Sequence, residues 1–307
     1  MNDVVVVHYA SQRAANWDLL RRAARAMGLR LTSWEPHRIG LVITGEVIAT
    51  HYDGRPVRPE RLLHRTVSPF PGLLRAAARI WTATGTTVLN DVDASFRARD
   101  KVLTTLALRA AGIPVVDTVV FDEPDPDTLR GLGSRDLILK PAHGVRGEGI
   151  EAFTDAEALT RAWSLRDDRS HRQTLGGYHV AREHYLAQPL IGGGGADLRA
   201  YVVGDACVAL MRRRAKKGEF RANMDLGAAA EPLDLDQPAA GTAAAALRAC
   251  DLDYGGVDLI EDDDGVIRVL EVDAWAGFAH ITACTGVDVA GAVLDRAIAA
   301  RRGAGSR

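Results

Sequence analysis

Residues 256–273 read GVDLIEDDDGVIRVLEVD, and this segment decides the fold. Asp264-Gly265 is a preferred two-residue hairpin turn, because both positions of such a turn need a positive φ angle. Counting outward from that turn places Asp258 opposite Glu271 on the paired strand. Side chains alternate between the two faces of a strand, so Asp273 shares a face with Glu271. The segment therefore predicts a hairpin that carries three acidic side chains on one face.

The three carboxylates indicate a metal site. Like charges that lie directly opposite each other destabilise a strand pair unless something neutralises them. Apolar neighbours such as Leu259 and Val272 indicate that the hairpin is buried, and buried charges need partners. Hard carboxylate oxygens favour Mg²⁺, with the three carboxylates as its ligands. An ordinary exposed pair of acidic strands is the alternative, and it suits residues 261–264 at the turn.

A lysine and a glycine-rich loop point to phosphate. Lys140 ends an apolar strand expected over residues 137–140, where a cation is better placed to meet a phosphate than to meet solvent. Residues 144–149 then read GVRGEG, and the backbone N–H groups of such a loop can close over phosphates. A glycine loop alone is a weak signal, because many are only turns. Lys101, on a helix expected over residues 94–111, reads by itself as part of a solvated helix face.

A second hairpin is expected around Gly204-Asp205. It pairs residues 198–203 with residues 206–211 and places Asp197 opposite Arg212, with Arg199 on the same face. These side chains form a structural ion-pair network or present cations to a transferred phosphoryl group. The sequence leaves both interpretations open.

The composition excludes several classes of protein. The chain has 307 residues, 47% hydrophobic and 25% charged, with a net charge of -2, which predicts two or three compact units and no nucleic-acid or membrane partner. Its three cysteines are scattered, which fits a reducing compartment and gives no zinc signal. No apolar run is long enough to span a bilayer. Together these features predict a cytoplasmic protein.

Strand and helix patterns alternate along the chain, which predicts an α/β (α+β) fold. Asn16 is expected to cap the first helix, which ends at Gly28. The expected units are residues 1–92, 93–184 and 185–307.

From Asn90 to Asp288 the chain resembles the ATP-grasp superfamily, and specifically the RimK-type carboxylate–amine ligases. Each motif is modest, but their order and spacing are specific: LKP at 139–141, the loop at 144–149, AQPLI at 187–191, DLR at 197–199, FRAN at 220–223 and the acidic strand pair. The resemblance implies an ATP-grasp fold. In that fold a small N-terminal α/β domain precedes two α+β subdomains that grip ATP.

The resemblance also implies a role for each site residue. The ATP phosphates would be contacted by two lysines and the glycine loop: Lys101, Lys140, Gly144, Arg146, Gly147 and Gly149. Adenine would be contacted by Gln188, Leu190 and Ile191. Two Mg²⁺ ions, with Mn²⁺ as an alternative, would be held by Asp258, Glu271 and Asp273. The transferred γ-phosphoryl group and the acyl intermediate would face Arg199, Arg212 and Asn223.

The implied reaction joins two small molecules. A carboxylate would attack the γ-phosphate to give an acyl phosphate and ADP, and an amine would then form the amide and release phosphate. Substrates of amino-acid or peptide type are expected. The sequence leaves open whether the chain forms a homo-oligomer. The alternative is a non-catalytic or kinase-like nucleotide-binding protein of the same fold.

The chain departs from the family pattern at positions near the expected site. Asp273 stands where the family usually has Asn. Leu226-Gly227-Ala228 lacks the arginine that commonly follows the position of Asn223. The missing cation argues against glutamate, the best-known substrate of these enzymes.

Overall fold

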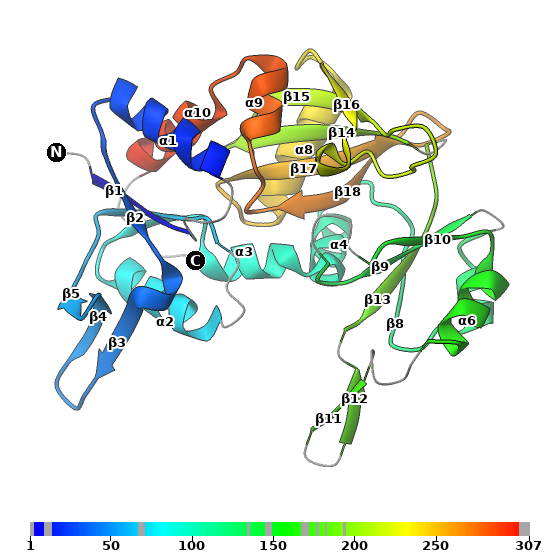
Figure 1. The fold of residues 1–307 in the computed structure, drawn as a ribbon, viewed down its shortest axis with the longest axis horizontal. Coiled ribbons are helices and arrows are strands. Elements are labelled where there is room, and N and C mark those ends of the chain that lie inside the picture. The colour runs from blue at the N-terminus through cyan, green and yellow to red at the C-terminus, as the bar shows by residue number, and fades with distance from the viewer. Residues whose placement is uncertain are drawn as a thin grey trace.

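The computed structural model describes residues 3–8, 14–66, 71–133, 136–144, 149–166, 172–175, 178–181, 183–192 and 195–300. Its main sheets and their helices confirm the predicted α/β class. Helices α3 (Val92–Arg99) and α4 (Lys101–Ala110) cross the middle of the molecule, between the N-terminal sheet on the left of Figure 1 and the middle sheet on the right. None of the helices in these residues is long and apolar enough to cross a membrane.

The N-terminal unit is a parallel sheet in the order β2-β1-β6-β7. Its strands are β1 (Asp3–Val7), β2 (Arg30–Trp34), β6 (Arg61–His64) and β7 (Thr87–Leu89). Val4 and Val6 of β1 pack in the cluster that includes α1 (Ala14–Ala26), whereas Val5 and Val7 pack in that of α2 (Pro71–Ala83). Burial on both faces explains why β1 is a continuous apolar run. A small antiparallel sheet lies beside α2 and follows η1 (Pro36–Arg38): β3 (Ile39–Ile43), β4 (Ile48–Tyr52) and β5 (Arg55–Pro56).

The middle sheet is antiparallel in the order β10-β9-β13-β8. Its strands are β8 (Val119–Phe121), β9 (Leu137–Pro141), β10 (Glu151–Phe153) and β13 (Tyr185–Pro189). Leu129 of α5 (Pro126–Arg130) and Leu159 of α6 (Ala156–Ser164) pack on Leu137 and Leu139 of β9. β13 lies in this sheet, although the unit boundary expected from the sequence falls just before it. A separate hairpin consists of β11 (Arg172–Leu175) and β12 (Tyr178–Ala181).

The C-terminal sheet is antiparallel in the order β16-β15-β14-β17-β18. Its strands are β14 (Ala196–Val203), β15 (Ala206–Arg214), β16 (Ala229–Pro232), β17 (Tyr254–Glu261) and β18 (Ile267–Asp273). One face carries Leu198 and Val257 and packs on α8 (Pro238–Ala249). The other face carries Tyr201 and Met211 and packs toward α10 (Val289–Ala299) and β1. Helix α9 (Ala279–Thr285) and the short η2 (Met224–Leu226) complete this unit.

The β14–β15 pairing differs from the expected one by one residue. A register shift between Tyr201 and Val202 places Asp197 opposite Arg213, so the predicted pairing of Asp197 with Arg212 is wrong. A β-bulge adds one unpaired residue to a strand, and every later side chain then changes face. Arg213 therefore occupies the face that the sequence assigned to Arg212.

The β17–β18 pairing confirms the predicted register of Asp258 opposite Glu271. The turn itself is different, because the N–H of Asp262 donates to the carbonyl of Val266, and three residues lie between this hydrogen-bonded pair. Gly265 takes the positive φ of 78° that ends such a turn. A second shift, between Asp258 and Leu259, restores the expected register, so the two irregularities cancel at the acidic residues.

Two capping side chains act differently from the sequence prediction. Asp100 divides the helix expected over residues 94–111, because its carboxylate accepts from the backbone N–H of Val102 and Leu103 and caps α4. Asn16 lies inside α1, and its Oδ1 accepts from the N–H groups of Phe278 and Ala279 at the start of α9. Asn16 thus connects the first helix to the C-terminal unit instead of capping its own helix.

Asn90 ties the N-terminal sheet to the C-terminal sheet. Its fully buried amide donates to the carbonyls of Tyr254 and Ala274, at 2.8 and 3.3 Å. Its Oδ1 accepts from the N–H groups of Asp253 and Tyr254, at 2.7 and 3.0 Å. Four backbone groups far away in the sequence therefore depend on one side chain.

We expect Asn90→Ala to lower the free energy of unfolding by about 3–5 kcal/mol, because it leaves several buried backbone groups without partners. Urea unfolding measures the loss. Gln237→Ala is the control, since Gln237 stands at a helix N-cap without a side-chain hydrogen bond and should change stability by less than about 0.5 kcal/mol. Equal unfolding midpoints for the two variants would contradict the assignment.

Candidate active site

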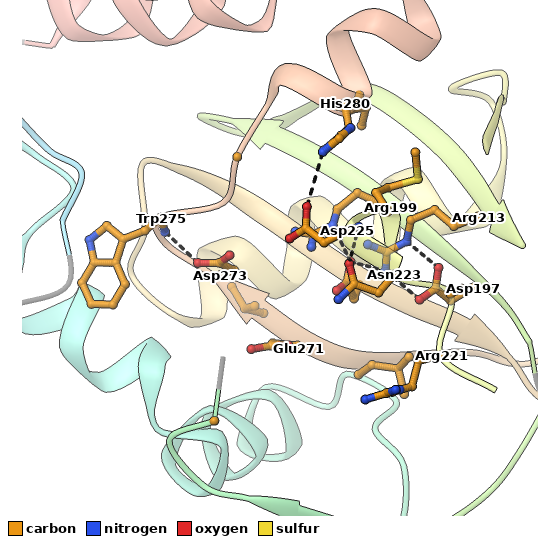
Figure 2. A pocket seen from close by; sticks show the side chains of 18 of the residues that line it. Asp197, Arg199, Arg213, Arg221, Asn223, Asp225, Glu271, Asp273, Trp275 and His280 are labelled. Atoms are coloured by element: carbon orange, nitrogen blue, oxygen red, sulfur yellow. Dashed lines mark hydrogen bonds and ion pairs between the residues drawn. The ribbon is translucent and has the colours of Figure 1, made fainter. Parts of the chain in front are cut away.

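A cavity of about 970 Å³ is lined by residues from all three main sheets. Among the residues predicted for the site, it is lined by Lys101, Lys140, Gly144, Gln188, Leu190, Ile191, Arg199, Asn223, Asp258, Glu271 and Asp273. Figure 2 shows part of this wall, with Arg199, Asn223 and Glu271 among the labelled side chains. Gly149 is adjacent to the lining residue Ile150, and Arg146 and Gly147 lie outside the described residues.

Two lysines face Glu271 in the cavity. Because Asp100 caps α4, Lys101 is the first residue of that helix, and its Nζ lies 2.8 Å from the carbonyl oxygen of Gly144 and 3.6 Å from Glu271 Oε1. Burial lowers the pKa of Lys140 from 10.5 to about 8, and the charge of Lys101 adds to this effect, although Glu271 opposes it. Desolvation inside the cavity also raises the pKa of Glu271, although Lys101 opposes the shift and the side chain stays accessible from the cavity. The two cations are thus placed to receive an anion.

An arginine cluster continues the wall on β14 and β15. Arg213 binds Asp197 through two hydrogen bonds, with Nε–Oδ1 at 2.7 Å and Nη2–Oδ2 at 2.6 Å. Arg213 also lies 3.0 Å from Asp258 Oδ1, and the Nε of Arg199 lies 2.6 Å from the same oxygen. Burial raises the pKa of Asp197 to about 6, although Arg213 opposes the shift. The cluster holds two guanidinium groups in fixed positions beside the acidic hairpin.

Arg212 is not part of this cluster. It projects from the other face of β15 and pairs with Glu231 at 3.4 Å. Arg213 lines the cavity and Arg212 does not, for the register reason given above.

The three acidic residues share the cavity but do not converge on one point. In the described part of the chain, no group of three His, Cys, Asp or Glu side chains is close enough together to hold a metal ion. Asp258 pairs with the two arginines, Glu271 lies toward Lys101, and Asp273 accepts from the N–H of Trp275 at 2.9 Å. The three carboxylates therefore do not converge as the hairpin alone predicted: two of them lie beside cations, and the third accepts from a backbone N–H.

The donor set nevertheless fits a hard divalent cation. Asp258 Oδ1 is buried without a properly oriented hydrogen bond, despite the two guanidinium groups near it. The side chain of Glu271 is 42% exposed, and it lines the cavity. Carboxylate oxygens that leave room for phosphate are typical of Mg²⁺ sites.

Part of the cavity lining is an apolar slot. Val116, Ile138, Ile260 and Leu270 line the cavity together with residues 188–191. The side chain of Gln188 donates to Thr118 Oγ1 at 2.9 Å, which fixes its orientation. A flat apolar slot beside exposed backbone suits a purine ring.

Comparison with known proteins shows the family to which this chain belongs. Over 279 residues the chain is 34% identical to a probable alpha-L-glutamate ligase of Xanthomonas oryzae pv. oryzae, and the alignment covers 90% of each protein. Residues 161–297 match the RimK-like ATP-grasp domain. The chain belongs to the RimK-like ATP-grasp ligases. A relative from Thioalkalivibrio sulfidiphilus with the same description is 31% identical over 282 residues, covering 90% of this chain and 88% of the relative.

Solved structures confirm the ATP-grasp fold. The ATP-grasp ligase PsnB, complexed with a phosphomimetic variant of its minimal precursor, Mg and ADP, superposes with a TM-score of 0.72 at 21% identity, covering 97% of this chain and 98% of that one. The D-cycloserine synthetase DcsG superposes with a TM-score of 0.64 at 19% identity, covering 96% and 98%. This RimK-like ligase is thus an ATP-dependent enzyme of known fold, and ATP-grasp ligases use ATP and Mg²⁺.

Four of the arginines that line the cavity were not among the predicted site residues: Arg65, Arg99, Arg213 and Arg221. Arg213 was hidden by the bulge. Arg65 directly follows the buried strand β6, and Lys140 lies near the end of β9, so the argument used for Lys140 applies to Arg65 as well. Arg65 could have been found as a charged residue directly after a buried parallel strand, because ligands bind at the carboxyl ends of such strands.

The corrected arginine can be tested directly. We expect Arg213→Met to reduce kcat by about 100-fold, because a positioned cation at the site of charge development is lost. Arg212→Met is the matched control and should change kcat by about twofold or less, since its salt bridge lies on the other face. Steady-state ADP release measures both variants, and a larger loss in Arg212→Met would contradict the assignment.

The lowered pKa of Lys140 predicts a pH dependence of nucleotide binding. Phosphate favours the protonated lysine, so the affinity for Mg-ATP should be constant well below pH 8 and fall as pH rises through about 8 in the free enzyme. Lys140→Arg stays charged and should not show this fall, whereas Lys140→Met should bind weakly at every pH. Calorimetric titration with Mg-ATP at a series of pH values measures this affinity. The same fall in wild type and Lys140→Arg would contradict the assignment to Lys140.

Proposed function

We propose that this ligase joins a carboxylate to an amine through an acyl phosphate, releasing ADP and phosphate, with an amino acid or peptide among its substrates. The single observation that carries the proposal is that one cavity brings these groups together. Its lining includes apolar side chains, Lys101 and Lys140, the three predicted carboxylates, and the paired arginines Arg199 and Arg213, which are the kinds of group that a nucleotide and a transferred phosphoryl group require.

The lysines and the apolar slot support the placement of ATP. Residues 188–191 and their apolar neighbours would hold adenine, and Lys101 and Lys140 would bind the phosphates together with the loop that begins at Gly144. Two Mg²⁺ ions held by Asp258, Glu271 and Asp273 would supply neutralisation of the phosphate charge.

The arginines support transfer to a carboxylate. Arg199 and Arg213 are held by carboxylates in the free protein, so little reorganisation is needed when negative charge develops beside them. Asn223 lines the same region, and its Oδ1 accepts from the N–H of Asp225, which fixes the start of η2. The acyl carbon would lie between these groups and the N-terminal unit, where the amine enters.

Trapping with hydroxylamine tests the acyl phosphate. With Mg-ATP and a panel of amino acids and small carboxylates, we expect ADP, phosphate and a hydroxamate only when a substrate acid and a nucleophile are both present. Glu271→Gln should lower the rate by about 100-fold or more, because a proposed carboxylate ligand of Mg²⁺ is lost. Glu261→Gln, on the same hairpin but outside the cavity lining, is the control. ATP consumption with acid alone and a stable phosphorylated product would favour a kinase-like enzyme instead.

A further inference from the structure

Arg65 brings a cation from the N-terminal unit into the cavity. It directly follows β6, its side chain lines the cavity, and its guanidinium is largely buried. Its Nη2 donates to the carbonyl of Ala276 at 2.8 Å, and its Nη1 donates to the hydroxyl of Tyr201 at 3.4 Å. The guanidinium carbon lies 4.8 Å from the ring centroid of Phe278 and 5.6 Å from that of Tyr254.

These contacts leave the charge of Arg65 without an anion. No carboxylate within 4.0 Å pairs with it among the residues that the structure describes, unlike Arg199 and Arg213. A carbonyl, a hydroxyl and two ring faces stabilise a guanidinium, but none of them carries a negative charge. A buried cation is costly unless it is paired, so the site favours the entry of an anion. A guanidinium has five N–H donors, and the hydrogen bonds to Ala276 and Tyr201 do not use them all.

Arg65 lies close to the reacting centre. The carbonyl that it binds belongs to Ala276, and a side chain built at Gly256 would meet both the Cβ of Ala276, at 2.6 Å, and Nη1 of Arg199, at 2.4 Å. Arg199 and the partner of Arg65 therefore flank the same glycine. A molecule that occupies the acyl site beside Arg199 is within reach of a second interaction at Arg65.

We propose that Arg65 binds a substrate carboxylate other than the one that is activated. This role of Arg65 rests on the ligase function proposed above. The substrate with the second carboxylate is either an amino acid that supplies the amine or a dicarboxylic acid that serves as acyl donor. The planar fork of an arginine suits a carboxylate. Residues 224–230 read MDLGAAA and contain no cation of their own.

The experiment compares acids with their carboxamides in wild type, Arg65→Met, Arg65→Lys and the control Arg61→Met. Arg61 lies on β6 and pairs with Glu60 at 3.3 Å, outside the cavity lining. Wild type should prefer each acid to its carboxamide. Arg65→Met should raise the KM for the acid by about 10- to 100-fold while the KM for the carboxamide changes little. Arg65→Lys should retain part of the preference, and Arg61→Met all of it.

An assay with hydroxylamine shows whether the carboxylate that Arg65 binds belongs to the amine substrate or to the acyl donor. Hydroxylamine replaces the amine substrate and carries no carboxylate. If Arg65 binds the amine substrate, hydroxamate formation by Arg65→Met keeps the wild-type donor KM. If Arg65 binds the acyl donor, the donor KM rises in the hydroxylamine assay as well. Equal use of acid and carboxamide by wild type, or equal effects of Arg65→Met on both, would overturn the proposal. Wild-type hydroxamate formation reports on the ligase function separately, so failure of one inference is not mistaken for failure of the other.

Discussion

The register of four neighbouring strands, β15-β14-β17-β18, is the constraint on which the cavity depends. Arg199 lies opposite Asp258 across β14 and β17, and Asp258 lies opposite Glu271 across β17 and β18. A slip of one residue would turn every side chain to the other face of the sheet, where α8 packs. Because that face is filled with apolar side chains, burial of Leu198 and Val257 enforces the register that places the charged residues in the cavity.

Buried polar links then fix the N-terminal unit over this sheet. Asn90, Asn16 and Arg65 each bind backbone groups of the C-terminal unit more than 160 positions away. Such hydrogen bonds are directional, whereas apolar packing tolerates sliding, so they determine orientation as well as affinity between the units. The cavity lies where these links meet, and its walls therefore come from distant parts of the chain.

Much of this arrangement follows from local patterns, and the exceptions have local causes. Apolar runs and turn residues predicted most strands, and the acidic hairpin register was correct even though its turn was not. A β-bulge cannot be recognised from the alternation of side chains along a strand, so Arg212 was assigned to the face that Arg213 occupies. Asp100 reads as a helix residue until its carboxylate is seen to bind Val102 N–H. The partner of Asn16 is 262 positions away, and no short pattern encodes such a contact.

The charges in the cavity explain why its residues are arranged as pairs. Without a nucleotide, Asp258 is neutralised by Arg199 and Arg213, and Glu271 lies near Lys101. An entering polyanion competes with these carboxylates for the same cations, and part of its binding energy replaces existing ion pairs. The pairs thus lower the affinity for any single anion, but they keep each guanidinium oriented before substrate arrives. Arg65 has no such carboxylate in the described residues, so an anion bound there displaces no ion pair, and selectivity for an acidic substrate is strongest at that point.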